Sequence, residues 1–570
     1  MHSRLPLRLT FVALTLLLSA GPSPCAVGRE LVVAKRFAVT SGHPAASFAG
    51  LKVLQSGGNV IDAAVTTSMA MGVAAPWGSG LGGKLVMLYR EGDTGKIYCV
   101  EALNAAPQKL DTETFINLPR SQRRHGYASV CVPGLPAGLE LAHRRWGELS
   151  WEAVVTPAAE LAEAGVNFEP EMQPLFEHKT ERLSLNPAAA QMYLCEKQLP
   201  ALGKKLRFPK LAQTLREVAA HGADAFYRGD VAQRIVKVAR SNGSALTLAD
   251  FEQYRPRVIE PLERRFGDYE IATPPPPTTG GITVLAALGA LEQVDWAGRD
   301  LRDLESIEQL SRVLNQLYPL VDRGIADHVK SLDAARQLLS TEGIEAIRNE
   351  ALAVGAAASR VGQSAGDDLE GTLDDTADAS TSHLVVADSE GNVACVTQSL
   401  SYHFGASVVA ADTGVLLNNS MCNFNTRNLD SVNAIAPGKR PRSTIAPVIV
   451  MRDNEVRLAF GIPGGQRIAS TTALILLDTL RKGHSLSEAL IDWRYHLRRP
   501  VEPGQPHNQI DLEEGAPEDL RERLAARGWR SAEWRCDGSY FGGGNGVEYL
   551  PDGTLAAVAD PRRTNDAMGQ

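Results

Sequence analysis

An acidic, Ala/Gly-rich stretch at residues 355–380 divides this chain of 570 residues into two parts of different character. The part before it shows mostly helical periodicity, and the part after it is dominated by short apolar runs typical of β-strands. A stretch of such composition buries too little apolar surface to fold, so it predicts a mobile linker. The chain must therefore fold by combining a helix-rich part with a strand-rich part.

The predicted elements on the two sides of the linker follow this division. Helical periodicity marks residues 135–145, 151–165, 282–291 and 303–320, and a turn at residues 57–59 interrupts a further helical stretch from residue 42 to residue 73. Strand-like runs occupy residues 384–387, 393–396, 407–410, 448–451 and 456–460. Together these patterns predict a mixed α and β protein.

Thr381 directly follows the linker and precedes the strand-like run Leu384–Asp388. A hydroxyl residue at such a boundary predicts a cut site that exposes an N-terminal threonine. Its hydroxyl would act as the nucleophile, and its own α-amino group would accept the proton. A free α-amine titrates near pH ~8, so much of it is an available base at neutral pH. Since most threonines are surface or strand residues, this prediction depends on the surrounding sequence.

Composition narrows the classes of function. The chain carries 58 Lys and Arg against 66 Asp and Glu, a formal net charge of −8, and 44% hydrophobic residues. This balance is typical of a soluble globular protein, and its scattered arginines with only short basic clusters argue against a nucleic-acid partner. The cysteines form no CxxC pair and no HExxH motif occurs, so no metal site is expected.

The N-terminus predicts an export signal over residues 1–26. Arg4 and Arg8 precede the apolar run Leu9–Ala20, which is short for a membrane span, and cleavage near Ala26 would give a periplasmic or extracellular protein. A retained membrane anchor is the alternative. Six cysteines would remain after cleavage, either paired or as buried thiols.

Two short motifs imitate other active sites. Gly78–Lys84 nearly spells a P-loop, but Leu85 stands where the Mg²⁺-binding hydroxyl is needed, so a tight turn is favoured. Gly362–Gly366 matches the GxSxG pattern, yet it lacks the strand before it and the helix after it that a nucleophile elbow requires. We therefore expect neither nucleotide binding nor a serine nucleophile.

A larger set of motifs occurs in a fixed order along the chain. They are GGNVIDAA from residue 57, SGLGG from residue 79, VPG from residue 132, TSH from residue 381, LNN from residue 417, PGKRP from residue 437, GIPGG from residue 461 and DPR from residue 560. From about Val32 to the C-terminus, the chain resembles the γ-glutamyltransferase (γ-glutamyltranspeptidase, glutathione hydrolase) family of N-terminal-nucleophile hydrolases.

The resemblance implies an α+β fold, the four-layer αββα sandwich in which two stacked antiparallel sheets are covered by helices. It also implies a cut between Ser380 and Thr381, which would yield a large subunit (27–380) and a small subunit (381–570) that remain one folded unit. Thr381 would then attack a small-molecule amide and form an acyl-enzyme, and water or a second amine would take the acyl group. This chemistry needs no cofactor.

Individual site residues are carried over with the motifs. Gly464 and Gly465, which alone would be read as a turn, match the oxyanion hole. Ser399 matches the hydroxyl that hydrogen-bonds the nucleophile, and Ser443 and Thr444 match hydroxyls on the carboxylate side of the glutamyl group. Further matches at Asn59, Asp62, Asp322, Arg323 and Arg494 are interpreted as architectural.

The glutamyl head-group positions depart from the family. An Arg that holds the α-carboxylate is replaced by Leu103. The Asn, the Gln or Glu, and the Asp that hold the α-amino group are replaced by Ser401, Ser420 and Asn423. Losing one partner of a desolvated charge pair costs about 2–5 kcal/mol, so γ-glutamyl groups should bind weakly.

Lys84 and Arg442 stand where the family has small or uncharged residues, so they are candidates for a relocated cation. The short segment between Phe424 and Pro437 predicts an open pocket. We expect an amidase whose acyl group lacks the α-amino acid head group or carries its carboxylate elsewhere. The alternatives are an ordinary hydrolase or transpeptidase of glutathione and γ-glutamyl compounds, and a catalytically inactive paralogue with a binding role.

Overall fold

The computed structural model describes residues 31–296, 298–353, 379–499 and 507–570. The predicted export signal, the GxSxG-like stretch at 362–366 and the linker up to residue 378 lie outside these residues. None of the helices in the described ranges is both long and apolar enough to cross a membrane.

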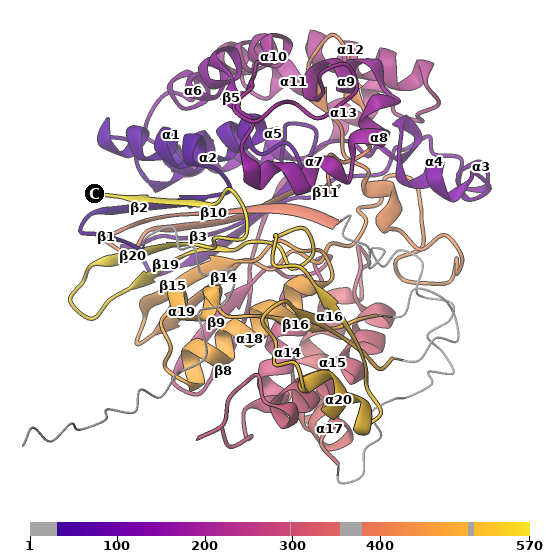
Figure 1. Ribbon diagram of the computed structural model, residues 1–570. Coiled ribbons are helices and arrows are strands. Elements are labelled where there is room, and N and C mark those ends of the chain that lie inside the picture. The colour runs from indigo at the N-terminus through magenta and orange to yellow at the C-terminus, as the bar shows by residue number, and fades with distance from the viewer. Residues whose placement is uncertain (1–30, 297, 354–378, 500–506) are drawn as a thin grey trace, which may run out of the picture.

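Two seven-stranded antiparallel sheets form the centre of the molecule (Figure 1). The first contains, in order, β21 (Asp566–Gly569), β2 (Phe37–Ser41), β10 (Ala379–Asp388), β11 (Val393–Tyr402), β3 (Lys84–Arg90), β4 (Ile97–Ala102) and β7 (Arg257–Ile259). The second contains β1 (Val32–Ala34), β20 (Leu555–Ala559), β19 (Asn545–Tyr549), β15 (Glu455–Gly461), β14 (Val448–Arg452), β9 (Tyr269–Thr273) and β8 (Leu262–Phe266). Each sheet therefore mixes strands from before and after residue 380.

Helices cover the outer face of each sheet (Figure 1). The first sheet is covered by α1 (Pro44–Gln55), α2 (Val60–Ala74), α5 (Leu135–Trp146), α6 (Trp151–Ala164) and α10 (Pro209–His221). The second is covered by α14 (Gly280–Leu291), α15 (Leu304–Gly324), α17 (Thr341–Ala351), α18 (Arg467–Arg481) and α19 (Leu486–Ile491). The predicted four-layer αββα sandwich is confirmed.

Within strand β10, the run Leu384–Ala387 is apolar without alternation, and the structure gives the reason. Leu384 and Val386 belong to the apolar core under the helices, whereas Val385 and Ala387 belong to the apolar layer between the two sheets. A run of residues that is buried on both faces of a sheet favours apolar side chains at successive positions. The same reasoning applies to residues 393–396 of β11, whereas the buried polar side chains of Thr397, Gln398 and Ser399 in the same strand form hydrogen bonds.

Local signals set the ends of several elements. Asn59 caps α2 and forms a capping box with Asp62, which agrees with their architectural interpretation. The run predicted as a strand at 407–410 pairs only over Val409–Ala410 (β12). Ser407 has a φ of 57°, a left-handed conformation that a β-ladder does not accept, so the prediction was two residues too long.

A glycine at the contact of the two sheets gives a test of this packing. A Cβ on Gly461 would overlap the imidazole of His383, so we expect Gly461→Ala to lower the melting temperature, at a cost of about 1–3 kcal/mol for overpacking. Calorimetry against Gly42→Ala, whose new methyl would meet only ordinary contacts of 3.7 Å or more, provides the control. Equal melting temperatures for the two variants would contradict the described packing.

Candidate active site

Thr381 lies at an irregularity in the central strand pair. Ser380 is paired with Ser401 and Ser382 with Gln398, so two residues of β11 lie opposite the single residue Thr381. Such a bulge changes the direction of the local side chains, and bulges are frequent beside active sites. Thr381 is buried, with 3% of its surface exposed, and its side chain faces a cavity.

The hydroxyl of Ser399 links the predicted nucleophile to the peptide bond before it. Thr381 Oγ1 donates to Ser399 Oγ at 3.3 Å, and Ser399 Oγ donates to the carbonyl oxygen of Ser380 at 2.7 Å. The backbone N–H of Ser401 donates to Ser399 Oγ at 2.9 Å and fixes its position. The Thr381 hydroxyl therefore stands next to a carbonyl that is polarised by a hydrogen bond, an arrangement suited to attack on that carbonyl.

The backbone of Thr381 is held from two further directions. Arg563 Nη1 donates to the Thr381 carbonyl oxygen at 3.1 Å. A Cβ on Gly78 would lie 2.9 Å from the same oxygen and 2.6 Å from Ser382 Oγ, so only glycine fits there. The P-loop-like stretch thus leads into strand β3 instead of a helix, and its first glycine packs against the candidate nucleophile.

His383 is close in sequence but is not a candidate base. Its Nδ1 lies 2.8 Å from Thr397 Oγ1 and its Nε2 lies 3.5 Å from Cys395 Sγ. Burial lowers the pKa of His383 to about 3, so the imidazole stays neutral at any working pH. Its role is to pack between the sheets, and the base must come from elsewhere.

The glycine pair precedes helix α18. Gly464 and Gly465 have φ values of 140° and 61°, conformations that side chains rarely adopt. Within the described chain, neither backbone N–H donates to a backbone carbonyl. Gln466, the next residue, lines the same cavity as Thr381. Neither glycine is itself among the described residues that line the cavity, so their role as N–H donors to an oxyanion stays a prediction.

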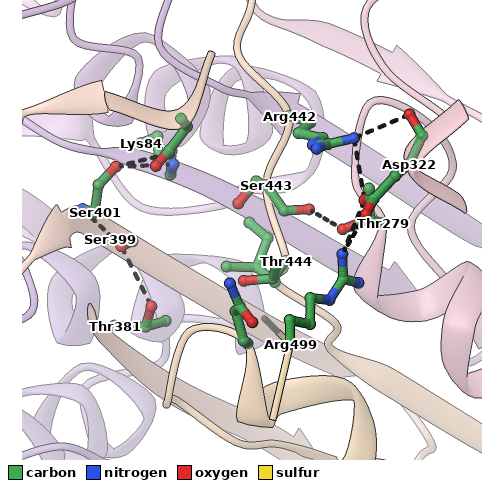
Figure 2. Close-up of a pocket in the computed structure, with 13 residues that line it drawn as sticks. Lys84, Thr279, Asp322, Thr381, Ser399, Ser401, Arg442, Ser443, Thr444 and Arg499 are labelled. Atoms are coloured by element: carbon green, nitrogen blue, oxygen red, sulfur yellow. Dashed lines mark hydrogen bonds and ion pairs between the residues drawn. The ribbon is translucent and has the colours of Figure 1, made fainter. Parts of the chain in front are cut away.

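Thirteen residues line this cavity, and hydroxyl groups and cations dominate among them. They are Lys84, Thr279, Asp322, Thr381, Ser399, Ser401, Asn423, Arg442, Ser443, Thr444, Ile445, Gln466 and Arg499. Figure 2 shows Lys84, Ser401, Ser399 and Thr381 on one side, Arg442, Asp322 and Arg499 on the other, and Ser443 with Thr444 between them. The structure thus brings together most of the residues that the sequence singled out.

Asp322, which its motif match marks as architectural, lies in the cavity wall. Its carboxylate accepts two hydrogen bonds from Arg499 Nη1, at 2.8 and 3.0 Å, and lies 3.2 Å from Arg442 Nη1. The three side chains form part of the cavity wall, and together they carry one net positive charge. Sequence reasoning missed Arg499, Thr279, Ile445 and Gln466, because no local pattern marks them.

Ser401 is the centre of a second polar cluster in the cavity. Its Oγ accepts from Lys84 Nζ at 3.1 Å and from Asn423 Nδ2 at 3.2 Å, and it lies 2.8 Å from Ser420 Oγ. Ser420 itself accepts from Asn104 Nδ2 at 2.7 Å and stands behind the cavity wall. Ser401 has a φ of 83°, an unusual conformation for serine that occurs where function constrains the backbone.

Leu103 does not reach the cavity, contrary to its assignment to the substrate site. Its side chain is fully buried in the apolar layer between the sheets, and its carbonyl accepts a hydrogen bond from Tyr254. Burying a leucine side chain in an apolar layer is more favourable in free energy than placing it in a polar cavity. This position therefore supplies neither a cation nor a contact for a substrate.

Comparisons with known proteins agree with this geometry. The model of the family described as Gamma-glutamyltranspeptidase matches residues 46–570. A glutathione hydrolase proenzyme of Bacillus subtilis is 28% identical over 95% of this chain and 92% of its own length, and an acylase ACY 1 proenzyme of a Pseudomonas species is 30% identical over 91% of each chain. The crystal structure of a cephalosporin acylase from Bacillus halodurans superposes with a TM-score of 0.83 at 25% identity, covering 97% of this chain and 99% of the other.

The shared carboxylate of Asp322 provides a test of the cavity wall. Asp322→Asn would remove the carboxylate that Arg442 and Arg499 share, and breaking a buried ion pair costs about 3–5 kcal/mol, so we expect a lower melting temperature. Asp268→Asn removes a solvent-exposed partner of Arg452 and should change it little. A melting temperature for Asp322→Asn as high as that of this control would show that the cluster does not support the wall.

Proposed function

Because the chain belongs to the gamma-glutamyltranspeptidase family, we propose that it is an enzyme that cuts itself before Thr381 and then hydrolyses or transfers the acyl group of an amide. The supporting observation is the position of the Ser399 hydroxyl between the Thr381 hydroxyl and the Ser380 carbonyl. Two subunits, residues 27–380 and 381–570, would result. The name proenzyme, borne by glutathione hydrolase and acylase relatives, fits this maturation.

In the maturation step, the Thr381 oxygen attacks the Ser380 carbonyl carbon, the hydroxyl proton passes to the peptide nitrogen, and this nitrogen leaves as the α-amine of Thr381. Water then hydrolyses the resulting ester. In each later turnover, the Thr381 oxygen attacks the substrate carbonyl while the α-amine accepts the hydroxyl proton and passes it to the leaving amine. The N–H groups of Gly464 and Gly465 would stabilise the oxyanion, and water or a second amine would release the acyl group.

The proposed acyl group lacks the α-ammonium of a γ-glutamyl group. Ser401 and Asn423, at two of the positions where the family holds that ammonium, are neutral. Asp322 is the one carboxylate among the described residues of the cavity wall, and two arginines already share it. A substrate ammonium would enter without an anionic partner, which is unfavourable in a buried site. The acylase names of two relatives fit this substrate class.

The maturation step can be tested by sequencing the N-terminus of the smaller fragment of the purified protein. We expect this fragment to begin at Thr381. Thr381→Ala should remain a single chain, and Ser399→Ala should be processed at least about tenfold more slowly, because the hydrogen bond to the Ser380 carbonyl is lost. Ser399→Thr keeps the hydroxyl and should restore the rate. An uncut wild-type chain would instead favour the inactive paralogue with a binding role.

The acyl preference can be tested with two substrates that differ only in the ammonium group. Glutaryl-p-nitroanilide is γ-glutamyl-p-nitroanilide without its α-amino group, so it avoids the cost of an unpaired cation. We expect kcat/KM to be at least about tenfold higher for the glutaryl compound. A preference for the γ-glutamyl compound would support the alternative, an ordinary γ-glutamyl hydrolase or transpeptidase, which the name of the Bacillus subtilis relative favours.

A further inference from the structure

The cavity contains one cation without an acidic partner. Lys84 is the first residue of β3, has 2% of its surface exposed, and donates to the Ser401 hydroxyl. None of the carboxylates in the described part of the chain forms an ion pair with it. Arg442 and Arg499 differ in this respect, because both contact Asp322. Of the three cations in the cavity, Lys84 is therefore the one without an acidic partner, whereas Arg442 and Arg499 share one.

A buried ammonium group without a counter-ion is costly, and the surroundings of Lys84 do not lower the cost. Burial lowers its pKa to about 8, so most of the group is still charged at neutral pH. The titratable groups that face it are the thiols of Cys131 and Cys422, and burial raises the pKa of both, so they stay neutral. Arg124, near Cys422, adds only a further positive charge.

The neighbours of Lys84 supply hydrogen-bond donors but no anion. Asn423 Nδ2 donates to the same Ser401 oxygen, and Asn104 Nδ2 donates to Ser420 in the layer behind. The ammonium has three hydrogens, and one of them is used by Ser401. Such a group of donors around an uncompensated charge is complementary to a carboxylate.

We propose that Lys84 determines the substrate specificity of this site by binding a carboxylate at the far end of the acyl group. The inference rests on the function proposed above, in which the acyl carbonyl lies at Thr381. It selects, as substrates, amides of short dicarboxylic acids in which one carboxyl group forms the amide and the other stays free.

The geometry connects this carboxylate site to the nucleophile. Lys84 is the register partner of Ser399 on the neighbouring strand. Ser401 joins the two sites, because its N–H donates to Ser399 and its hydroxyl accepts from Lys84. Lys84 and Thr381 also line the same cavity, so an acyl group attached at Thr381 can direct its far end toward Lys84.

The experiment uses two substrates that differ in one charge. Glutaryl-p-nitroanilide carries the free carboxylate, and 5-amino-5-oxopentanoyl-p-nitroanilide carries an uncharged carboxamide of the same shape. For the processed wild-type enzyme, we expect kcat/KM to be at least about 30-fold higher for the carboxylate, mainly through KM. Lys84→Met, of similar length but uncharged, should reduce this preference to within about threefold, because only the carboxylate loses an ion pair with the lysine.

Two further variants complete the design. Lys84→Arg keeps the positive charge and should keep most of the preference for the carboxylate. Lys210→Met, an exposed lysine beside Asp412, makes the same chemical change away from the cavity and should leave both substrates unaffected. Equal losses for both substrates in Lys84→Met would assign Lys84 a structural role and overturn the proposal, and so would a wild-type enzyme without a preference for the carboxylate.

The pH profile gives an independent readout that does not require the Lys84→Met variant to mature. Lys84 is charged below its pKa and neutral above it, so the KM for the glutaryl compound should rise as the pH passes through about 8. The KM for the carboxamide should show no such rise, and parallel profiles would overturn the proposal. Sequencing each preparation for a Thr381 N-terminus separates this result from a failure of the proposed maturation.

Discussion

The hydrogen-bonded pairing of β10 with its two neighbours holds the site together. From Val385 to Asp388, β10 pairs with β2, and over most of its length it pairs with β11. Strand β2 precedes residue 380 and strand β11 follows it, so the pairing joins the two parts of the chain. A break in the peptide bond before Thr381 would leave these pairs and both apolar layers in place. The fold would therefore tolerate the proposed cut, because strand β10 is paired on both sides.

A second constraint comes from the C-terminal segment that crosses from one sheet to the other. Asp560 begins this crossing directly after β20 of the second sheet. It contacts the buried guanidinium groups of Arg494 and Arg562, and Arg562 also pairs with Glu513. Burial alone raises the pKa of Asp560, but the two arginines hold it below its usual value. Removing one member of this network is strongly destabilising, because its partner would remain as an unpaired buried charge. It fixes the segment that brings Arg563 to the Thr381 carbonyl.

Much of this arrangement could be predicted from the sequence, for physical reasons that differ between residues. The strand containing Leu384–Ala387 was recognisable because burial on both faces demands an unbroken apolar run. Helix α2 was recognisable because Asn59 sits where a cap is needed after a turn. Thr381 and Ser399 were placed by their motifs, and the structure brings their hydroxyl groups within 3.3 Å of each other.

Other features depend on contacts between distant segments, which a sequence motif does not encode. Asp322 and Arg499 are 177 positions apart in the chain, and nothing in the sequence around either residue predicts that they pair. Matching Leu103 to a family position fixed its place along the chain but not the direction of its side chain, and an apolar side chain turns to the apolar layer. Side-chain direction is decided by packing, so positional matching is least dependable where the residue type has changed.

In the cavity, the residues proposed for catalysis and those proposed for substrate recognition form two separate groups. In the proposed mechanism, the groups that act on the amide carbonyl are hydroxyls, backbone N–H groups and the α-amine of Thr381, held by the central strands and by the turn before α18. The groups that face the rest of the acyl chain are charged or amide side chains from β3, from the segment around Asn423 and from the wall formed by Asp322, Arg442 and Arg499. Replacing a residue in the second set changes the electrostatic complement of the cavity without moving Thr381 or Ser399. The lysine beside the neutral Ser401 and Asn423 has no acidic partner, and under the proposed function it would favour an acyl group that carries a simple carboxylate.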